Sequence, residues 1–100
     1  MPVSEASDSK RATLTVVVPV FNESLSLQAF HQRLMPVLAA LEHDQAIDSS
    51  VLYVDDGSTD SSAMTIERLA ADEPRLGLLR LSRNFGKEVA MSAGLDHARG

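Results

Sequence analysis

Two short apolar runs, each followed at once by a cluster of turn-forming and acidic residues, constrain the fold of this chain most strongly. The first run, 14–18, leads into Pro-Val-Phe-Asn-Glu at 19–23, and the second run, 51–54, leads into Asp-Asp-Gly-Ser-Thr-Asp at 55–60. Runs of β-branched residues that give way to helical periodicity are typical of buried parallel strands. In open α/β sheets, ligands bind beyond the carboxyl ends of such strands. Both polar clusters therefore lie where a binding crevice is expected.

The first predicted unit is a strand followed by a helix. Residues 14–18 form the strand, and Pro19 is expected to end it because proline cannot donate a hydrogen bond to a ladder. The helix spans about 24–41, where apolar residues recur at spacings of three and four. These residues are Leu27, Phe30, Leu34, Leu38 and Leu41. Pro36 falls inside the pattern and predicts a kink or break, and the polar stretch 43–50 is expected to be a connection.

Two further pairs of strand and helix follow. The second strand covers 51–54 or 55, and the helix after it spans about 61–71. The third strand covers 76–81, and the last helix, about 87–98, is followed by Gly100, where a helix-terminating glycine belongs. The residues expected to face the sheet from these two helices are Ala63, Ile66, Leu69, Ala70, Ala90, Ala93 and Gly94.

Strands that alternate with helices predict right-handed crossovers and a parallel sheet, which is an α/β fold. Residues 1–12 are polar and small and lack the apolar core of a secretion signal, so we expect a disordered tail before a domain at 13–100. Three parallel strands leave an open edge, so we expect an incomplete domain whose fourth strand would come next. No stretch approaches the ~18 apolar residues needed to span a bilayer.

Composition excludes several classes of function. The net charge of −5, with no basic stripe, argues against a nucleic-acid surface. The absence of cysteine excludes disulfides, thiolate metal sites and cysteine nucleophiles. His31, His43 and His97 lack metal-ligand spacing and are expected to be ordinary surface or helix-face residues. No histidine base is placed near Ser58 or Ser61, so a serine nucleophile is not expected.

The acidic residues of the first two loops allow two interpretations. Asp55 and Asp56 suit a ribose hydroxyl, a base N–H group or a divalent ion, or they form a turn followed by a helix cap. Asn22 and Glu23 offer an amide and a carboxylate toward the same crevice, with the same alternative. Two such loops on neighbouring strand ends favour the functional interpretation.

The third loop supplies positive charge. Arg83 and Lys87 flank Asn84, Phe85 and Gly86, and Lys87 begins the last predicted helix. Two cations beside the N–H groups of a helix N-terminus suit a diphosphate, and a glycine allows a ligand to approach the backbone closely. The alternative is that both cations are solvated surface charges.

Three motifs together resemble a known family. Val-Val-Val-Pro-Val-Phe-Asn-Glu at 16–23, Val-Asp-Asp-Gly-Ser-Thr-Asp at 54–60 and Leu-Ser-Arg-Asn-Phe-Gly-Lys-Glu at 81–88 resemble the start of family 2 glycosyltransferases. The likeness covers 14–100 and is greatest to the polyprenyl-phosphate branch, which includes dolichol-phosphate mannosyltransferase and undecaprenyl-phosphate glucosyltransferases. It implies the N-terminal part of a GT-A fold, a Rossmann-like sheet that binds a nucleotide sugar at its strand ends.

The resemblance also implies roles for individual residues. Pro19, Phe21 and Glu23 would line the nucleoside pocket, and the stretch 54–56 would contact the base and ribose. The loop 83–87 would lie near the diphosphate or the acceptor phosphate. The candidate nucleotide-sugar-binding residues are Pro19, Val20, Phe21, Asn22, Glu23, Val54, Asp55, Asp56, Ser58, Arg83, Asn84, Gly86 and Lys87. No catalytic residue is assigned.

The implied activity is transfer of a hexose from a nucleotide donor to a polyprenyl phosphate at the cytoplasmic face of the membrane, in cell-envelope glycan synthesis. The sequence at 83–88 resembles the glucosyltransferase-like members more than the mannosyltransferases, which implies UDP-glucose and not a GDP-hexose as the donor. Mg²⁺ or Mn²⁺ would offset the charge of the leaving diphosphate. The family's metal-binding Asp-X-Asp would lie beyond Gly100, so we expect no metal site in this chain and no turnover by it alone.

The chain is also a candidate for homo-oligomer formation. Other interpretations that the residues leave open are a non-catalytic remnant, a nucleotidyltransferase-like domain and a phosphoacceptor receiver domain. Nucleotidyltransferases commonly carry a glycine-rich basic loop after the first strand, and in receiver domains the acidic pair follows the first strand. Neither pattern is present here.

Overall fold

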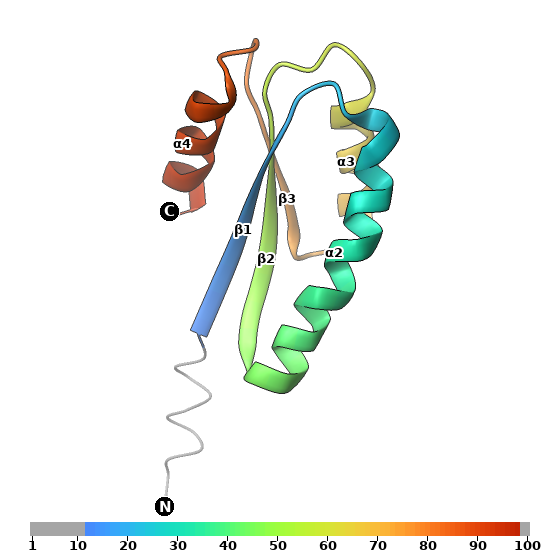
Figure 1. The fold of residues 1–100 in the computed structure, drawn as a ribbon, viewed down its shortest axis with the longest axis vertical. Coiled ribbons are helices and arrows are strands. Elements are labelled where there is room, and N and C mark those ends of the chain that lie inside the picture. The colour runs from blue at the N-terminus through green and yellow to red at the C-terminus, as the bar shows by residue number, and fades with distance from the viewer. Residues whose placement is uncertain (1–11, 99–100) are drawn as a thin grey trace, which may run out of the picture.

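The predicted alternation of strands and helices is confirmed. The computed structural model describes residues 12–98 and shows three strand–helix pairs in chain order (Figure 1). The elements are β1 (Ala12–Val20), α2 (Ser24–Gln45), β2 (Ile47–Asp55), α3 (Ser62–Ala71), β3 (Leu76–Arg80) and α4 (Lys87–Ala98). The last three differ from their predicted bounds by one residue at most, whereas β1, α2 and β2 are longer than predicted.

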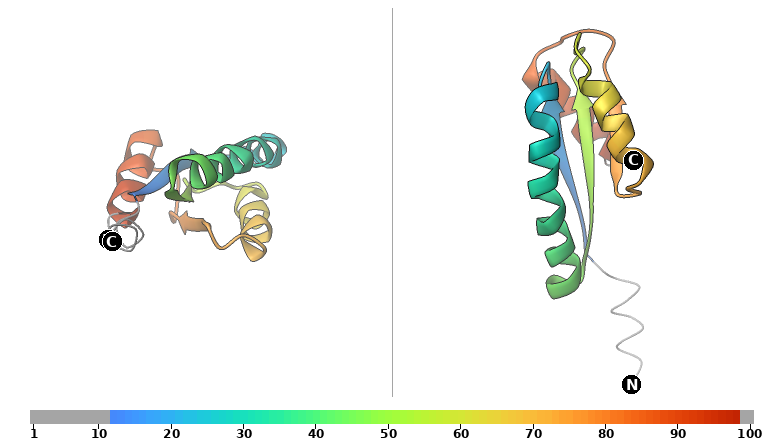
Figure 2. Two further views of the ribbon diagram at one scale, coloured as in Figure 1. Left: turned by 90° about the horizontal axis from the view of Figure 1, so that it is seen from below. Right: turned by 90° about the vertical axis from the view of Figure 1, so that its right-hand side faces the viewer.

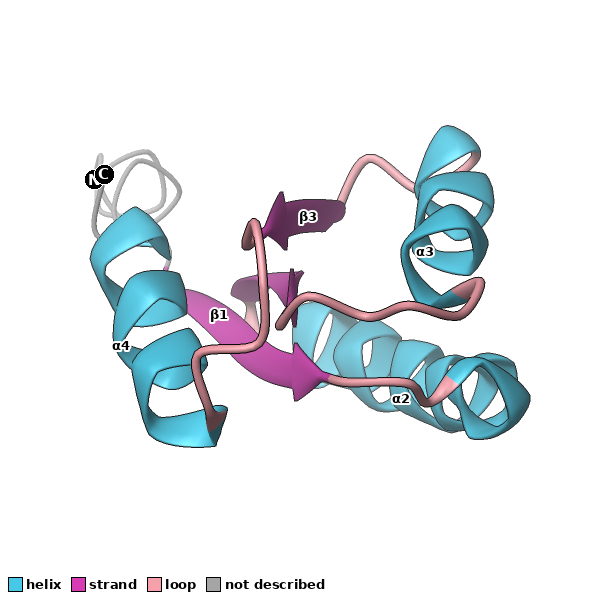
Figure 3. Cartoon of the chain, turned by 90° about the horizontal axis from the view of Figure 1, so that it is seen from above, coloured by secondary structure: helices cyan, strands magenta, loops and turns pink. Residues whose placement is uncertain are grey.

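The three strands form one parallel sheet in the order β1-β2-β3, as predicted. The register pairs Val20 of β1 with Asp55 of β2, and Asp55 with Arg80 of β3. All three strands therefore end at the same level, and the loops that follow them gather at one edge of the sheet (Figure 3).

Helices cover both faces of the sheet. α2 and α3 lie on one face and α4 on the other, over β1 and β2 (Figure 2). Side chains of β2 alternate between the two layers, as expected for a strand buried on both faces. Val51 and Tyr53 pack in the core under α2 and α3, whereas Leu52 and Val54 pack in the core under α4.

The prediction that Pro19 ends the first strand is wrong. Pro19 lies inside β1, paired with Val54, and the strand continues to Val20. Within the described residues β1 is an edge strand, and an edge tolerates a residue that cannot donate a hydrogen bond. Ala12 begins β1, and the remainder of the predicted tail, 1–11, lies outside the described residues.

The predictions of a break at Pro36 and of a polar connection at 43–50 are also wrong. α2 is one continuous helix across Pro36. Pro36 and Gln32, whose carbonyl loses its helical partner, are both exposed, so water can hydrate that carbonyl. Only Ala46, in the left-handed conformation at φ 56°, separates α2 from β2. Pairing with the start of β1 makes a strand of the polar residues at 48–50, because backbone pairing overrides their weak strand propensity.

The predicted inner faces of α3 and α4 are confirmed. Ala63 and Ile66 of α3 are buried, and Leu69 and Ala70 pack against the same core. In α4, Ala90 and Gly94 are buried and Ala93 is half-buried. Gly100 lies outside the described residues. No helix in the part of the chain that the structure describes is long and apolar enough to cross a membrane.

Of the two predicted positions, surface or helix face, His31 takes the helix face, because it lies on the buried side of α2 with Leu27 and Leu38. It is 8% exposed, and its Nδ1 lies 3.2 Å from the hydroxyl oxygen of Tyr53, which is fully buried. Burial disfavours the charged imidazolium and lowers the pKa of His31, while the negative charge of Glu73 opposes the shift to a smaller extent. α2 is therefore attached to β2 by a buried contact of a histidine whose neutral form is favoured by burial.

Replacing Gly94 by alanine is expected to destabilise the fold. A Cβ at this position would lie 2.5 Å from Cγ1 of Val17 and 2.7 Å from Cγ2 of Val54. In an exposed helix this change stabilises by about 1 kcal/mol, but here overpacking reverses the sign and costs about 1–3 kcal/mol. Urea unfolding measures the change, with the exposed Ser92→Ala on the same helix as control. A Gly94→Ala chain as stable as the parent would contradict the packing of α4.

The stability of the chain is expected to fall as the pH drops below 6.5, the ordinary pKa of histidine. Because the pKa of His31 is lower in the folded chain, the imidazole binds a proton at a higher pH in the unfolded chain. Acid therefore favours unfolding, by at most about 1.4 kcal/mol per pH unit. His31→Gln keeps a polar partner for Tyr53 but does not titrate. Urea unfolding at pH 7.5 and 5.5 should show a smaller loss for the glutamine variant. Equal losses would show that His31 does not contribute.

Candidate functional site

Three loops meet at the carboxyl edge of the sheet. We call them the first loop (21–23), the second loop (56–61) and the third loop (81–86), after β1, β2 and β3. Hydrogen bonds between backbone groups continue one step beyond the strands: Asp56 N–H donates to Val20 O at 2.8 Å, and Leu81 N–H donates to Asp55 O at 2.9 Å. The loops are therefore held close together where they begin.

Asn22 joins the first loop to the second. Its backbone has φ 51°, and its N–H donates to the Ser58 hydroxyl oxygen at 2.9 Å. Its side-chain oxygen accepts from the N–H groups of Thr59 at 2.8 Å and Asp60 at 3.3 Å. Asn22 and Ser58 are thus committed to contacts between the loops, whereas the sequence placed the amide of Asn22 in the crevice.

The N-terminus of α2 is capped by residues of the next loop and helix. The Ser62 hydroxyl accepts from Glu23 N–H at 3.0 Å, and the Asp60 carboxylate accepts from Ser24 N–H at 3.2 Å. Ser62 also donates its hydroxyl and its N–H to Asp60, at 2.6 and 2.9 Å. The hydrogen bonds from Ser62, followed by those from Ser24, lower the pKa of Asp60 to about 2. The contacts of Asp60 and Ser62 with the start of α2 could not be predicted from the sequence, since their partners lie 36 and 39 residues away.

The adjacent aspartates of the second loop have separate partners. Asp55 is 1% exposed, accepts from Ser58 N–H at 3.1 Å and lies 3.8 Å from Nε of Arg80. Asp56 is 3% exposed and accepts from the N–H groups of Phe85 at 2.8 Å and Gly86 at 3.1 Å. Asp55 therefore organises its own turn, while Asp56 holds the third loop. Ligand contacts of the two carboxylates stay a prediction.

The third loop crosses directly over Gly57. A Cβ on Gly57 would lie 2.2 Å from the carbonyl carbon of Arg83 and 2.3 Å from Asn84 N, and φ is +73°. Only glycine fits both the conformation and this close approach. At the end of the loop, the Arg83 guanidinium lies 4.7 Å from the centre of the Phe85 ring, within the range of a cation–π contact.

The loops enclose a cavity of about 210 Å³, which we call the strand-end pocket. It is lined by Pro19, Val20, Phe21, Glu23, Asp56, Asn84, Gly86 and Lys87, all of which the sequence selected. Three charged residues line it: Glu23 from the first loop, Asp56 from the second loop and Lys87 from the start of α4. The selected residues that do not line it are Asn22, Val54, Asp55, Ser58 and Arg83. Val54 is fully buried in the core under α4.

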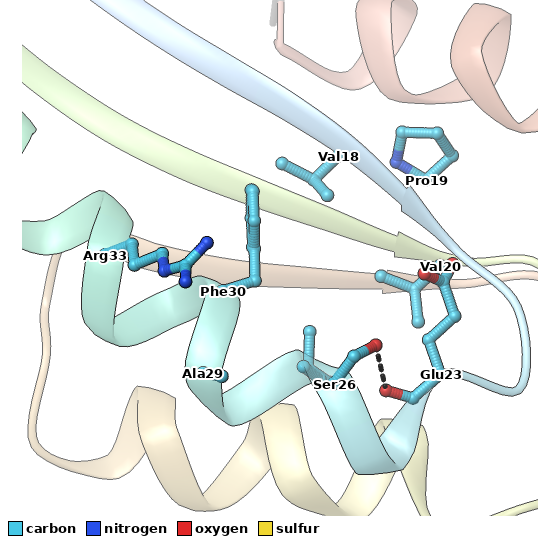
Figure 4. Close-up of a pocket in the computed structure, with 9 residues that line it drawn as sticks. Val18, Pro19, Val20, Glu23, Ser26, Ala29, Phe30 and Arg33 are labelled. Atoms are coloured by element: carbon cyan, nitrogen blue, oxygen red, sulfur yellow. Dashed lines mark hydrogen bonds between the residues drawn. The ribbon is translucent and has the colours of Figure 1, made fainter.

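A larger cavity of about 420 Å³ lies between β1 and α2, and we call it the α2-side pocket. Figure 4 shows Glu23 at one end and Arg33 at the other, with Val18 and Phe30 between them. It shares Pro19, Val20 and Glu23 with the strand-end pocket. It lies beside the free edge of β1, and apolar side chains form most of its wall. Size alone therefore does not mark the site, and the strand-end pocket is the better candidate because it gathers charged groups from the first loop, the second loop and the start of α4.

The described residues do not form a metal site. Between residues 12 and 98, no group of three or more histidine, aspartate or glutamate side chains is placed to hold a metal ion. Both carboxylate oxygens of Asp56 accept backbone N–H groups, and Oε1 of Glu23 accepts from Phe21 N–H at 3.3 Å. The two carboxylates of the pocket are thus already engaged in holding the loops.

Gly57→Ala is expected to displace the third loop. The added Cβ meets backbone atoms that cannot yield, so Phe85 and Gly86 should lose their hydrogen bonds to Asp56. Amide hydrogen exchange at these two residues should accelerate by about tenfold. Ser61→Ala, an exposed change in the same loop, serves as the control and should leave both rates unchanged. Unchanged exchange in Gly57→Ala would show that the two loops are not in contact.

Comparison with known proteins identifies relatives of this chain. An uncharacterized glycosyltransferase of Bacillus subtilis is 37% identical over 93 residues, which is 92% of this chain and 27% of that protein. A prophage bactoprenol glucosyl transferase homolog of Escherichia coli is 37% identical over 87 residues, which is 87% of this chain and 27% of that protein. The bactoprenol glucosyl transferase of Shigella phage SfV is 36% identical with the same coverage. The chain thus spans 27% of the length of these relatives.

A solved structure shares the fold. A mannosyltransferase from Pyrobaculum calidifontis, in complex with GDP-Man and Mn²⁺, superposes with a TM-score of 0.71 at 25% identity, covering 90% of this chain and 25% of that one. The predicted N-terminal part of a GT-A fold is thereby confirmed. Residues 15–100 match the family model for glycosyl transferase family 2, which excludes the nucleotidyltransferase and receiver-domain alternatives. The chain belongs to glycosyl transferase family 2.

Proposed function

We propose that the strand-end pocket binds the nucleoside diphosphate part of a nucleotide sugar. The observation that carries this proposal is that Glu23, Asp56 and Lys87, from three separate parts of the chain, line one cavity at the carboxyl edge of a parallel sheet. The cavity, about 210 Å³, is smaller than the roughly 300–1,000 Å³ of most ligand pockets. It therefore suits the nucleoside end of the donor, with the sugar lying outside it.

The nucleoside end would rest on Phe21 and the two carboxylates. Phe21 is 42% exposed although it lines the pocket, so its ring is accessible to a base. Base–aromatic stacking stabilises by about 1–3 kcal/mol per base. Carboxylate oxygens of Glu23 and Asp56 keep lone pairs beyond those used in the loops, and these suit base N–H groups and ribose hydroxyls.

The diphosphate end would rest on Lys87 and the start of α4. Lys87 is the first residue of this 12-residue helix, whose N-terminal N–H groups and dipole favour an anion. Gly86 precedes it at φ +102°, and a Cβ there would meet nothing within 4 Å. The side of Gly86 that a Cβ would occupy is thus open to a phosphate oxygen, while its N–H donates to Asp56 at 3.1 Å. The pocket combines two carboxylates, which suit the nucleoside, with a cation and a helix N-terminus, which suit the diphosphate.

The activity of the whole protein is part of the same proposal. Relatives named bactoprenol glucosyl transferase support transfer of a hexose to a polyprenyl phosphate. We take UDP-glucose as the donor and the cytoplasmic face of the membrane as the location, as the resemblance of the motifs implies. Mg²⁺ or Mn²⁺ would neutralise charge on the leaving diphosphate. Residues 12–98 provide no ligand set for that ion. The contribution of this chain is to bind and orient the donor.

The proposal predicts that UDP binds the chain and that binding depends on both ends of the pocket. Lys87→Met should weaken UDP by about tenfold, through loss of a charge-assisted contact, while uridine is affected less. Phe21→Ala should weaken UDP and uridine alike, because both stack on the ring. Calorimetry measures the affinities, and Arg68→Met removes an exposed cation from α3 as a control. Equal affinity for UDP in the parent, Lys87→Met and Phe21→Ala would refute the site.

A further inference from the structure

Phe21 and Glu23 both line the strand-end pocket, yet the residue between them does not. Asn22 turns the backbone at φ 51°, a conformation that asparagine tolerates better than most residues. On the inner side of this turn, Phe21 N–H donates to Oε1 of Glu23 at 3.3 Å. The orientation of the two pocket side chains therefore depends on how the backbone at Asn22 is held.

Asn22 makes three hydrogen bonds with the second loop. The Ser58 hydroxyl accepts from Asn22 N–H at 2.9 Å, and the side-chain oxygen of Asn22 accepts from the N–H groups of Thr59 and Asp60 at 2.8 and 3.3 Å. Ser58 is itself fixed, because its N–H donates to the buried carboxylate of Asp55 at 3.1 Å. These bonds connect the buried end of β2 to the exposed turn of the first loop.

We infer that Asn22 is a positioning residue, which sets Phe21 and Glu23 at the pocket without touching the ligand. Its side-chain oxygen is fully used by the second loop, and its backbone N–H by Ser58. The adjoining bonds of Ser62 and Asp60 to Glu23 and Ser24 fix the other side of the turn. The inference rests on the proposed nucleoside diphosphate site and assigns Asn22 a role that differs from the ligand contact implied by the motif.

Two substitutions separate positioning from ligand contact. Asn22→Gly permits the positive φ but removes the side-chain acceptor. Asn22→Asp keeps an acceptor oxygen for Thr59 and Asp60 but removes the amide N–H donors that a ligand could use. A positioning role predicts that the aspartate variant retains function and the glycine variant loses it, whereas contact through the amide predicts that both lose it. Salt at about 0.15 M screens the added charge only beyond about 8 Å, so uridine, which is uncharged, is titrated beside UDP to separate charge repulsion from loss of the site.

The experiment is a UDP titration of the ¹⁵N-labelled chain, followed by NMR. We expect Asn22→Gly to weaken UDP by about tenfold and Asn22→Asp to stay within about threefold of the parent. Without UDP, the amide resonances of Phe21 and Glu23 should move by more than the ordinary nearest-neighbour effect of the substitution in Asn22→Gly, and by no more than that effect in Asn22→Asp, which counts as unmoved. Equal affinities of the parent and Asn22→Gly would overturn the inference. So would loss of affinity in Asn22→Asp with the Phe21 and Glu23 resonances unmoved.

The spectra without ligand separate failure of this inference from failure of the proposed function. If the parent does not bind UDP, the proposed function fails, and the positions of the Phe21 and Glu23 resonances still decide the role of Asn22. Resonances that Asn22→Gly leaves unmoved would then overturn it. Should Asn22→Gly not fold, Ser58→Ala replaces it, because this change removes only the acceptor of Asn22 N–H and should move the same two resonances.

Discussion

The parallel register of the sheet is the constraint on which the rest of the structure depends. Val20, Asp55 and Arg80 are paired across three strands, so each strand releases its loop at the same level. A shift of one residue would turn the side chains of β2 to the opposite faces and separate the loops. The core fixes the register, because Tyr53 and Val54 are fully buried on opposite faces of β2.

Most polar side chains at this edge form hydrogen bonds with backbone N–H groups, and only some of them also line the pocket. Asp55, Asp60 and Ser62 accept or relay hydrogen bonds within the second loop and to the start of α2. Asp56 accepts two N–H groups of the third loop and also lines the strand-end pocket. Buried backbone donors must be paired, so a site built from loops requires such side chains. The same motif therefore serves both the fold and the proposed binding of a nucleoside diphosphate.

Local patterns predicted the order of elements, the parallel sheet and the edge where the pocket lies. They failed where the position of a strand in the sheet decides the outcome. Within residues 12–98 β1 is an edge strand, which tolerates Pro19, and residues 48–50 are a strand because β1 lies beside them. In the same way, the sequence could not tell Asp55 from Asp56, since adjacent residues at a strand end face different neighbours. Their partners, Ser58 and the third loop, become visible only in the folded chain.

If one nucleoside diphosphate contacts all three loops, amide chemical-shift mapping will detect it at each of them. On addition of UDP to the ¹⁵N-labelled chain, the largest changes should fall at 19–23, at Asp56 and at 84–87, the segments that line the strand-end pocket. Changes confined to Phe30 and Arg33, in the α2-side pocket, would place the ligand on the other side of β1. That result, or no change at saturating UDP, would contradict the account.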